Sequence, residues 1–234
     1  MPVITLVSPK GGAGKSTVAL VLALEFAADY PTTLIDADPN GPLQSWAEGG
    51  NVPPNLTIVS HVDEDNILKT IKRAAESTPI VLVDLEGTAA KIVVLALTQA
   101  DFAIIPLQPS QLDAAQANRA IKVIEECEVM TRRKLPYSVL LTRTSQTIRT
   151  RTLTHIQRTL EGSQIPVLHT ELHEREAYRA IFSFQQTLAG LNPAEVSNLD
   201  KAQANARQLT DEILTLLTPQ TAEETASQNT EQVA

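Results

Sequence analysis

The octapeptide from Lys10 to Thr17, K-G-G-A-G-K-S-T, has the composition of a phosphate-binding turn. It follows a short apolar run, Val3 to Val7, and leads into a helix-like apolar pattern. Glycines let the backbone curl with its N–H groups inward, so that phosphates sit at the positive end of the following helix. Lys15 is placed to reach the β- and γ-phosphates, and the Ser16 hydroxyl is placed to ligate Mg²⁺. The predicted nucleotide contacts in this turn are Lys10, Gly11, Gly12, Ala13, Gly14, Lys15, Ser16 and Thr17.

Two apolar runs further along the chain end in acidic residues. Asp36 and Asp38 follow the run from Thr32 to Ile35, and Asp84 follows the run from Ile80 to Val83. Ligands bind at the carboxyl ends of parallel strands, and carboxylates there suit a Mg²⁺ and water site beside the γ-phosphate. Asp36 and Asp38 also fit a simpler reading, as turn residues or a helix N-cap.

The phosphate-binding turn departs from the common P-loop pattern G-x-x-x-x-G-K-[ST], because Pro9 stands where the first glycine belongs. It has instead K-G-G-x-G-K-[ST], with a second lysine, Lys10, at its front. This sequence resembles the deviant Walker A box of the ParA/MinD family. The resemblance implies that Lys10 reaches across a dimer interface to the phosphates of the other subunit's nucleotide.

The same resemblance implies roles for the acids. Lys10, Lys15 and Asp38 would be the catalytic residues, with Asp38 orienting or activating the attacking water. Ser16, Asp36 and Asp84 would form the Mg²⁺ region. Two departures put fine positioning in question: Asn40 replaces the family's usual glutamine, and Glu86-Gly87 stands where the family has a pair of prolines after Asp84.

The base of the nucleotide has its own candidates, again by resemblance. Thr142 and Arg143 end the apolar run that starts at Tyr137, and the family places the adenine beside the loop after this strand. The segment that begins Leu172-His173 would cover the other edge of the adenine. This segment, together with Asp36-Ala37-Asp38, also resembles the small ParA-like proteins of T-DNA transfer (virulence C) operons.

Apolar runs that alternate with helical patterns predict how these residues are positioned. Strands are expected at 3–7, 32–36, 56–60, 80–84, 102–106, 137–142 and 166–169, and helices at 15–28, 67–75, 112–127, 149–161 and 201–217, with a short helix that starts at 42. The pattern predicts an α/β fold: a single-domain P-loop NTPase with a mainly parallel sheet of about seven strands and helices on both faces. The expected domain spans 1–218, and residues 219–234 are expected to form a disordered polar tail.

Composition narrows the classes of partner. The 234 residues carry a net charge of −8, which disfavours a generally nucleic-acid-binding protein. Residues 131–179, however, hold nine Lys or Arg and four Glu, a local balance of +5. The single cysteine, Cys127, excludes a disulfide within the monomer and fits a reducing cytosol. No run approaches the roughly 20 apolar residues that span a bilayer, and the acidic C-terminal helix disfavours a membrane partner.

The resemblance implies a slow ATPase that acts as a switch, cytoplasmic and nucleoid-associated when bound to ATP. ATP and Mg²⁺ would join two subunits, the homodimer would bind non-specific DNA, and a ParB-like or cargo adaptor protein would stimulate hydrolysis and release. Basic residues at 131–134, 143–158 and 175–179 are the candidate phosphate contacts. Two alternatives stay open: a metabolic P-loop ligase or kinase, and a positioning switch that uses a protein surface instead of DNA.

Overall fold

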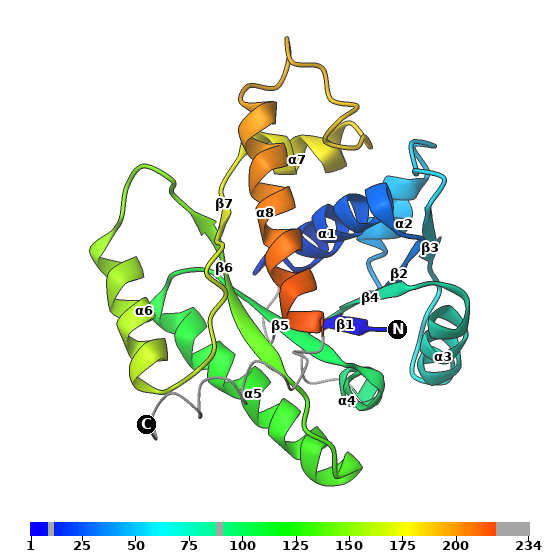
Figure 1. Cartoon of the computed structure of the whole chain (residues 1–234), viewed down its shortest axis with the longest axis vertical. Helices are drawn as coiled ribbons and strands as arrows, with labels where there is room; N and C mark the ends of the chain where they lie inside the picture. The colour runs from blue at the N-terminus through cyan, green and yellow to red at the C-terminus, as the bar shows by residue number, and fades with distance from the viewer. Residues whose placement is uncertain (9–11, 88–90, 219–234) are drawn as a thin grey trace, which may run out of the picture.

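One sheet of seven strands, all paired in parallel, forms the centre of the protein in the computed structural model (Figure 1). The structure describes residues 1–8, 12–87 and 91–218, and the side chains of 111–116 are not described. The strand order is β3-β2-β4-β1-β5-β6-β7. The strands are β1 (Val3–Leu6), β2 (Thr32–Ala37), β3 (Leu56–Val59), β4 (Ile80–Leu85), β5 (Phe102–Leu107), β6 (Tyr137–Thr144) and β7 (Leu172–His173).

Helices cover both faces of this sheet, which is why the strands are apolar along their whole length. Within the described residues they are α1 (Lys15–Asp29), α2 (Pro42–Ala47), α3 (Ile67–Ser77), α4 (Lys91–Gln99), α5 (Gln111–Thr131), α6 (Arg151–Gly162), α7 (Glu176–Ser183) and α8 (Leu199–Leu217). One core packs under α1, α2, α7 and α8, and the other under α3, α4, α5 and α6. Alternate residues of each strand serve the two cores: Ile4 points to the first, and Val3 to the second. The predicted fold class is therefore confirmed.

The end of the sheet differs from the prediction. The strand expected at 166–169 is wrong, because in this segment only Val167 bridges to β6, and the last strand is β7. The carboxylate of Glu212 in α8 accepts hydrogen bonds from the backbone N–H groups of His169 (2.6 Å) and Thr170 (2.8 Å). These amides therefore pair with a side chain rather than with another strand.

Several helix boundaries also differ from the sequence pattern. The helix expected at 112–127 runs from Gln111 to Thr131, and the one expected at 149–161 begins at Arg151. The Thr150 hydroxyl accepts a hydrogen bond from the N–H of Leu153 (3.1 Å), which caps α6 one residue before it begins. The helices α4 and α7 were not predicted. The sequence of α4, K-I-V-V-L-A-L-T-Q, is apolar nearly all round and shows no clear helical stripe.

The strand register brings the predicted site residues together. Asp84 pairs with Leu6 of β1 on one side and with Asp36 of β2 on the other. The turn after β1 and the acids after β2 and β4 therefore lie side by side at the carboxyl edge of the sheet. The strand order changes direction at β1, between β4 and β5, which is where open α/β sheets bind their ligands.

Candidate functional site

The described part of the phosphate-binding turn has the backbone that a phosphate cradle requires. Gly12 and Gly14 have φ values of +85° and +92°, a left-handed conformation that residues with a side chain rarely adopt. Gly14 is the N-cap of α1, and its carbonyl accepts the first helical hydrogen bond from the N–H of Val18 (2.8 Å). The turn therefore presents a helix N-terminus to its concave side. Lys10 and Gly11, which complete the predicted set, lie outside the described residues.

Neighbouring strands hold the turn in place. The Thr142 hydroxyl at the end of β6 donates a hydrogen bond to the carbonyl of Ala13 (3.0 Å), and the side-chain amide of Gln108 after β5 donates to the carbonyl of Gly12. Lys15 opens α1 and is 7% exposed, while Ser16 and Thr17 are half-buried beside it. The backbone that carries Lys15 and Ser16, the side chains predicted to contact phosphate and Mg²⁺, is therefore held by hydrogen bonds from neighbouring segments.

Asp84 is the most unusual group at this edge of the sheet. Its side chain is fully buried, and within the described residues neither carboxylate oxygen has a well-formed hydrogen-bond partner. Burial raises the pKa of Asp84 to about 7, with a further upward contribution from Asp36, while the nearby Ser16 hydroxyl and the charge of Lys15 lower it. A buried carboxylate without partners is costly and calls for a counter-charge.

A magnesium ion that arrives with a nucleotide would supply this counter-charge. No group of three or more His, Cys, Asp or Glu that could hold a metal by itself exists in the described residues. That agrees with the usual Mg²⁺ site, which takes one or two carboxylates and fills its other positions with phosphate oxygens and water. The Asp84 carboxylate and the Ser16 hydroxyl are the groups that fit such an ion.

Asp36 has a different task in this structure. One of its carboxylate oxygens accepts hydrogen bonds from the N–H groups of Leu43 and Gln44, both at 2.9 Å, at the start of α2. The other oxygen accepts a longer bond from the N–H of Asp38 (3.3 Å). Burial raises the pKa of Asp36, and these backbone hydrogen bonds oppose the rise. Asp36 therefore anchors the start of α2 and the loop that carries Asp38 from outside the helix, whose N-cap is Gly41. Its place in the Mg²⁺ region stays a prediction.

Asp38 is half-buried at the same edge, and Asn40 holds it. One oxygen of Asp38 accepts hydrogen bonds from the backbone N–H (2.9 Å) and the side-chain amide (2.8 Å) of Asn40. The shorter amide at position 40 thus reaches back to the acid of its own loop. The second oxygen of Asp38 makes no hydrogen bond that would compete with a water molecule within the described residues.

The far end of α2 is anchored by the segment after α7. The Trp46 indole donates to the carbonyl of Gln186 (3.3 Å), and the Gln185 side chain donates to the carbonyl of Ser45 (2.6 Å). Asn51 in turn donates to the carbonyl of Gln185 (2.9 Å). The loop with Asp38 is therefore held at both ends of α2, once by Asp36 and once by residues nearly 140 positions away.

A cavity of about 150 Å³ lies next to the phosphate-binding turn, where the base of a nucleotide would sit. Its lining includes all four residues named for the adenine and four further residues of the segment that begins Leu172-His173. Its walls are Gly14, Thr17, Thr142, Arg143, Leu172, His173, Glu174, Arg175, Tyr178 and Arg179. The structure thus brings the predicted contacts together, although their roles stay predictions. The sequence analysis did not name Glu174, Arg175, Tyr178 and Arg179 one by one, although they lie close to Leu172 in the sequence. A predicted helix from Glu176 would have indicated them.

The walls of this cavity are fixed by buried hydrogen bonds. The Nδ1 atom of His173 lies 2.8 Å from the Thr144 hydroxyl, and burial lowers the pKa of His173. The Tyr178 hydroxyl donates to the carbonyl of Ala202 in α8 (2.8 Å), and burial raises its pKa. Both side chains are therefore neutral near pH 7 and suit an uncharged aromatic ligand.

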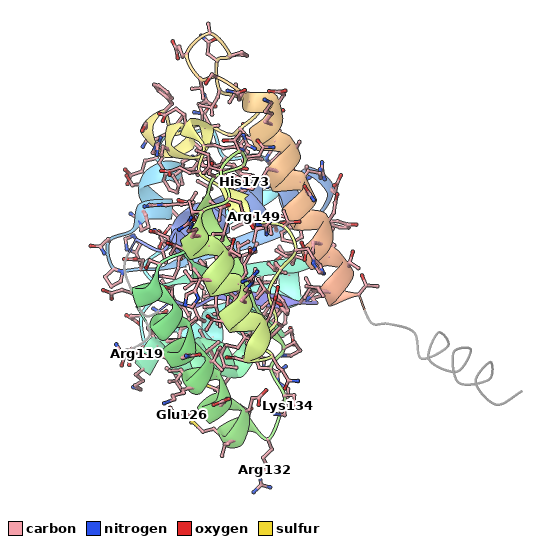
Figure 2. All side chains as sticks on the ribbon, turned by 90° about the vertical axis from the view of Figure 1, so that its left-hand side faces the viewer. Arg119, Glu126, Arg132, Lys134, Arg149 and His173 are labelled. Atoms are coloured by element: carbon pink, nitrogen blue, oxygen red, sulfur yellow. The ribbon has the colours of Figure 1, made fainter. Side chains whose placement is uncertain are left out.

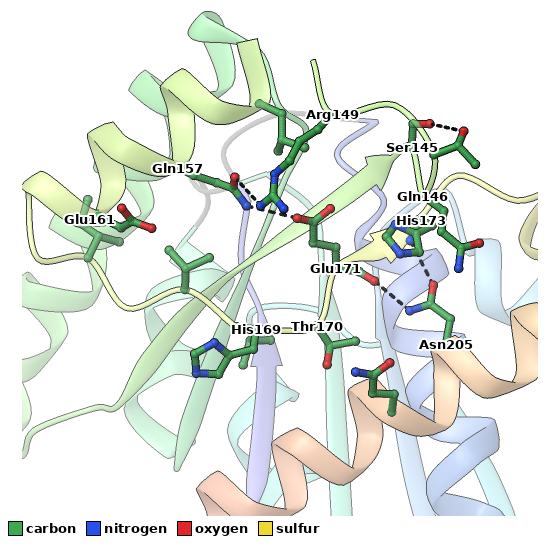
Figure 3. Close-up of a pocket in the computed structure, with 16 residues that line it drawn as sticks. Ser145, Gln146, Arg149, Gln157, Glu161, His169, Thr170, Glu171, His173 and Asn205 are labelled. Atoms are coloured by element: carbon green, nitrogen blue, oxygen red, sulfur yellow. Dashed lines mark hydrogen bonds between the residues drawn. The ribbon is translucent and has the colours of Figure 1, made fainter. Parts of the chain in front are cut away.

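A larger cavity of about 620 Å³ lies behind His173, between α6 and α8 (Figure 3). A row of hydrogen bonds crosses it: Arg149 donates to the side chain of Gln157 (2.9 Å), and Gln157 donates to Glu171 (3.1 Å). The Asn205 side chain of α8 donates to the carbonyl of Glu171 (2.8 Å). This polar row joins α6 to the segment before β7 and to α8.

The candidate DNA contacts fall into two groups in the structure. Several are already neutralised: Arg133 pairs with Asp101 (3.1 Å), Lys134 with Glu128 (2.7 Å), and Arg179 with Glu174 and Glu176 (2.9 and 2.8 Å). The arginines on and before α6 have no such partners within the described residues, and neither have Arg132 and Arg175.

The Asp84 carboxyl should make the stability of the nucleotide-free protein depend on pH. Its pKa in the folded protein lies near 7, above the value of about 4 in an unfolded chain, so the protein binds a proton on folding between these values. The free energy of unfolding therefore falls as the pH rises from about 4 to about 7. In Asp84→Asn the part of this fall that is due to Asp84 should be absent, so the variant should gain stability relative to the wild type between about pH 4 and about pH 7, by up to about 4 kcal/mol.

Urea unfolding at about pH 5 and about pH 8, without nucleotide or Mg²⁺, measures this difference. Glu25 and Asp36 also have raised pKa values, but both proteins retain them, so the comparison isolates Asp84. Parallel pH profiles for the two proteins would show that Asp84 is not the strained carboxylate.

Comparison with known proteins places this arrangement in a family. Residues 1–217 match the family described as VirC1 protein. The chain belongs to the VirC1 family. Among curated relatives, Protein ParA of Rhizobium radiobacter is 39% identical over 219 residues, which is 93% of this chain and 98% of the relative. Protein virC1 of Rhizobium rhizogenes is 28% identical over 189 residues, covering 77% of this chain and 80% of the relative.

Further similar proteins have names that refer to other processes. Maintenance of carboxysome distribution protein A of Halothiobacillus neapolitanus is 29% identical over 172 residues, 73% of this chain and 78% of its own. The solved cell division ATPase MinD of Pyrococcus furiosus superposes with a TM-score of 0.69 at 17% identity, over 92% of this chain and 99% of that one. A plasmid partition protein of Borrelia burgdorferi bound to AMPPNP gives a TM-score of 0.66 at 18% identity, over 89% and 97%. The ParA/MinD-like resemblance of the VirC1-family chain is therefore confirmed.

None of the helices in the described part of the chain combines the length and the apolar composition that crossing a bilayer requires.

Proposed function

We propose that this VirC1-family chain is an ATP-dependent switch that binds DNA without sequence preference when two ATP-bound copies associate. The observation that supports nucleotide binding is the Asp84 carboxylate beside the glycine turn at the N-terminus of α1. It is fully buried, and within the described residues neither of its oxygens has a well-formed hydrogen bond. An acid of this kind is unfavourable until a cation reaches it. Nucleotide with Mg²⁺ is the ligand that satisfies both the turn and the acid.

The side chains divide the work of binding and hydrolysis. Lys15 and the backbone of the turn hold the phosphates, and Ser16 and Asp84 hold Mg²⁺, which neutralises phosphate charge when bound. Asp38 orients the attacking water with the oxygen that Asn40 leaves free. Asp36 keeps the loop of Asp38 in position through α2. Thr142, Arg143, Leu172 and His173 line the adenine.

The family resemblance supplies the proposed partners. Lys10 of each subunit completes the nucleotide site of the other, so that ATP and Mg²⁺ hold a homodimer together. The dimer binds the nucleoid DNA, and a ParB-like or cargo adaptor protein stimulates slow hydrolysis and release. The support is the naming of relatives as partition and distribution proteins, and of one neighbour as a MinC:MinD complex.

Binding to random-sequence duplex DNA tests the switch. Fluorescence anisotropy should show tight binding with ATP and Mg²⁺, and weak or no binding with ADP and Mg²⁺ or without nucleotide. Between about 50 and about 200 mM salt the affinity should fall by at least about 10-fold, since phosphate contacts release counterions. Lys10→Ala is the matched control: it should bind ATP, remain monomeric by light scattering, and not bind DNA.

Two results would contradict the proposal. Equal DNA affinity in all three nucleotide states would remove the switch. No DNA binding in any state would leave a switch that acts on a protein surface.

A further inference from the structure

Residues 129–160 contain seven Lys or Arg and no Asp or Glu. The second half of this stretch holds four of them: Arg143, Arg149, Arg151 and Arg158. Arg143 lines the base-side cavity, so it belongs to the nucleotide site. The other three arginines lie on α6 or immediately before it.

The fold of α6 sorts its residues into two faces. Leu153, Ile156 and Leu160 are buried against the sheet. Arg151, His155 and Arg158 recur at helical spacing on the opposite side and are exposed. With Arg149 and Thr154 they line a shallow hollow of about 270 Å³. Figure 2 views the molecule with α5 and α6 toward the reader and labels Arg149 at the upper end of this face.

No carboxylate compensates these three arginines in the part of the chain that the structure describes. Ion pairs bind Arg133, Lys134, Arg179 and Arg207, but none reaches Arg149, Arg151 or Arg158. The guanidinium of Arg149 donates to the neutral amide of Gln157 (2.9 Å), which fixes its position without cancelling its charge.

The arrangement is unfavourable for an isolated helix. Cations at the start of a helix oppose its dipole, and like charges one or two turns apart repel each other. The first turn of α6 contains Arg151 and no acidic residue. A polyanion on this face would relieve both effects, so the free protein has a charged surface that a bound ligand would stabilise.

We infer that the outer face of α6, formed by Arg149, Arg151, His155 and Arg158, is the surface that contacts the phosphate backbone of duplex DNA. The inference rests on the proposed function and assigns the DNA contact to one helix. Arg151 and Arg158 are about 10 Å apart along the helix axis. One DNA strand carries a charge every 3.4 Å, so the row faces about three phosphates.

The second basic helix of the protein is a weaker candidate. Lys69, Lys72 and Arg73 are exposed on α3. Four acids lie beside or within that helix: Asp63, Glu64, Asp65 and Glu76. The local charge on α3 is therefore close to balance, whereas α6 carries excess positive charge. This contrast makes α3 the matched control for α6.

The experiment compares two triple variants with equal loss of charge. The α6 variant removes three charges from the outer face of α6: Arg149→Gln/Arg151→Gln/Arg158→Gln. The α3 variant removes three charges from α3: Lys69→Gln/Lys72→Gln/Arg73→Gln. With ATP and Mg²⁺, the affinity for random duplex DNA is measured across a salt series. The α6 variant should lose at least about 10-fold in affinity, and its log–log salt slope should shrink by about 2–3 per protomer, since each phosphate contact contributes about 0.9.

Two controls separate the surface from the nucleotide site. Both variants should retain ATP-dependent dimerisation and ATP turnover, because none of the six residues lines the base-side cavity or belongs to the phosphate-binding turn. An all-lysine α6 variant, Arg149→Lys/Arg151→Lys/Arg158→Lys, should recover the salt slope, because contact with phosphate needs charge more than shape.

Each remaining outcome counts against the inference. Unchanged DNA binding in the α6 variant would overturn it and leave the proposed function standing. Equal losses in the α3 and α6 variants would show that only total charge matters. A wild-type protein that binds no DNA in any nucleotide state would overturn the proposed function and the α6 surface together.

Discussion

Lys15→Gln should abolish ATP binding. Lys15 is 7% exposed at the first position of α1, directly after the left-handed Gly14, so its ammonium group acts in a site with little water to screen it. Removing one partner of a buried charge contact costs about 2–5 kcal/mol, because the opposite charge is left without compensation. We therefore expect ATP affinity to fall at least about 100-fold, which corresponds to about 3 kcal/mol.

Titration with a fluorescent ATP analogue or calorimetry measures this loss. Lys72→Gln is the matched control, since it removes the same charge from an exposed position on α3 and should leave the affinity unchanged. Thermal unfolding without nucleotide shows whether the Lys15 variant is folded. Normal ATP affinity in a folded Lys15→Gln protein would refute the phosphate-binding assignment.

Asp38→Ala should separate nucleotide binding from turnover. Asp38 does not hold the fold together as Asp36 does, because its hydrogen bonds stay within the turn that ends at Asn40. Loss of a group that positions or activates the attacking water typically lowers a rate by about 10²–10⁴-fold. The variant should bind ATP and dimerise like the wild type, while phosphate release in single-turnover assays falls by this factor.

Two companion variants make the result specific. Asp38→Asn keeps the shape of the side chain and removes its charge, so it should be as slow as the alanine variant. Asp65→Ala removes a carboxylate from the exposed turn before α3 and should hydrolyse ATP normally. Undiminished hydrolysis in Asp38→Ala would move the water-activating role to another residue.

Replacing Asp36, unlike Asp38, should disturb the fold, since the Asp36 carboxylate holds the backbone at the start of α2. The sequence places Asp36 and Asp38 two residues apart after one strand, and only the family resemblance assigns them different roles. Only the tertiary structure shows that Asp36 accepts three backbone hydrogen bonds and that Asp38 has an oxygen to spare. Residues of one type and one motif thus have different tasks because their surroundings differ.

Local patterns in the sequence were sufficient for the main features of the fold, and they predicted residues that the structure brings together at one edge of the sheet. A buried parallel strand is apolar throughout, so β1, β2, β4, β5 and β6 could be recognised without knowing their neighbours. A glycine turn between a strand and a helix, and acids at strand ends, are also local features. The strand predicted at 166–169 was wrong because the backbone amides of His169 and Thr170 pair with Glu212, more than 40 residues away.

The sequence by itself determined the phosphate-binding turn, the acids beside it and the parallel sheet, because each depends on residues that are close together in the chain. The tertiary structure decided which charged groups have partners. Within the described residues it left the oxygens of Asp84 buried without a well-formed hydrogen bond, joined Arg133 to Asp101, and gave Arg151 and Arg158 no ion pair. Electrostatic interactions depend on distances in space, so the charged groups without a protein partner can be identified only from the folded structure.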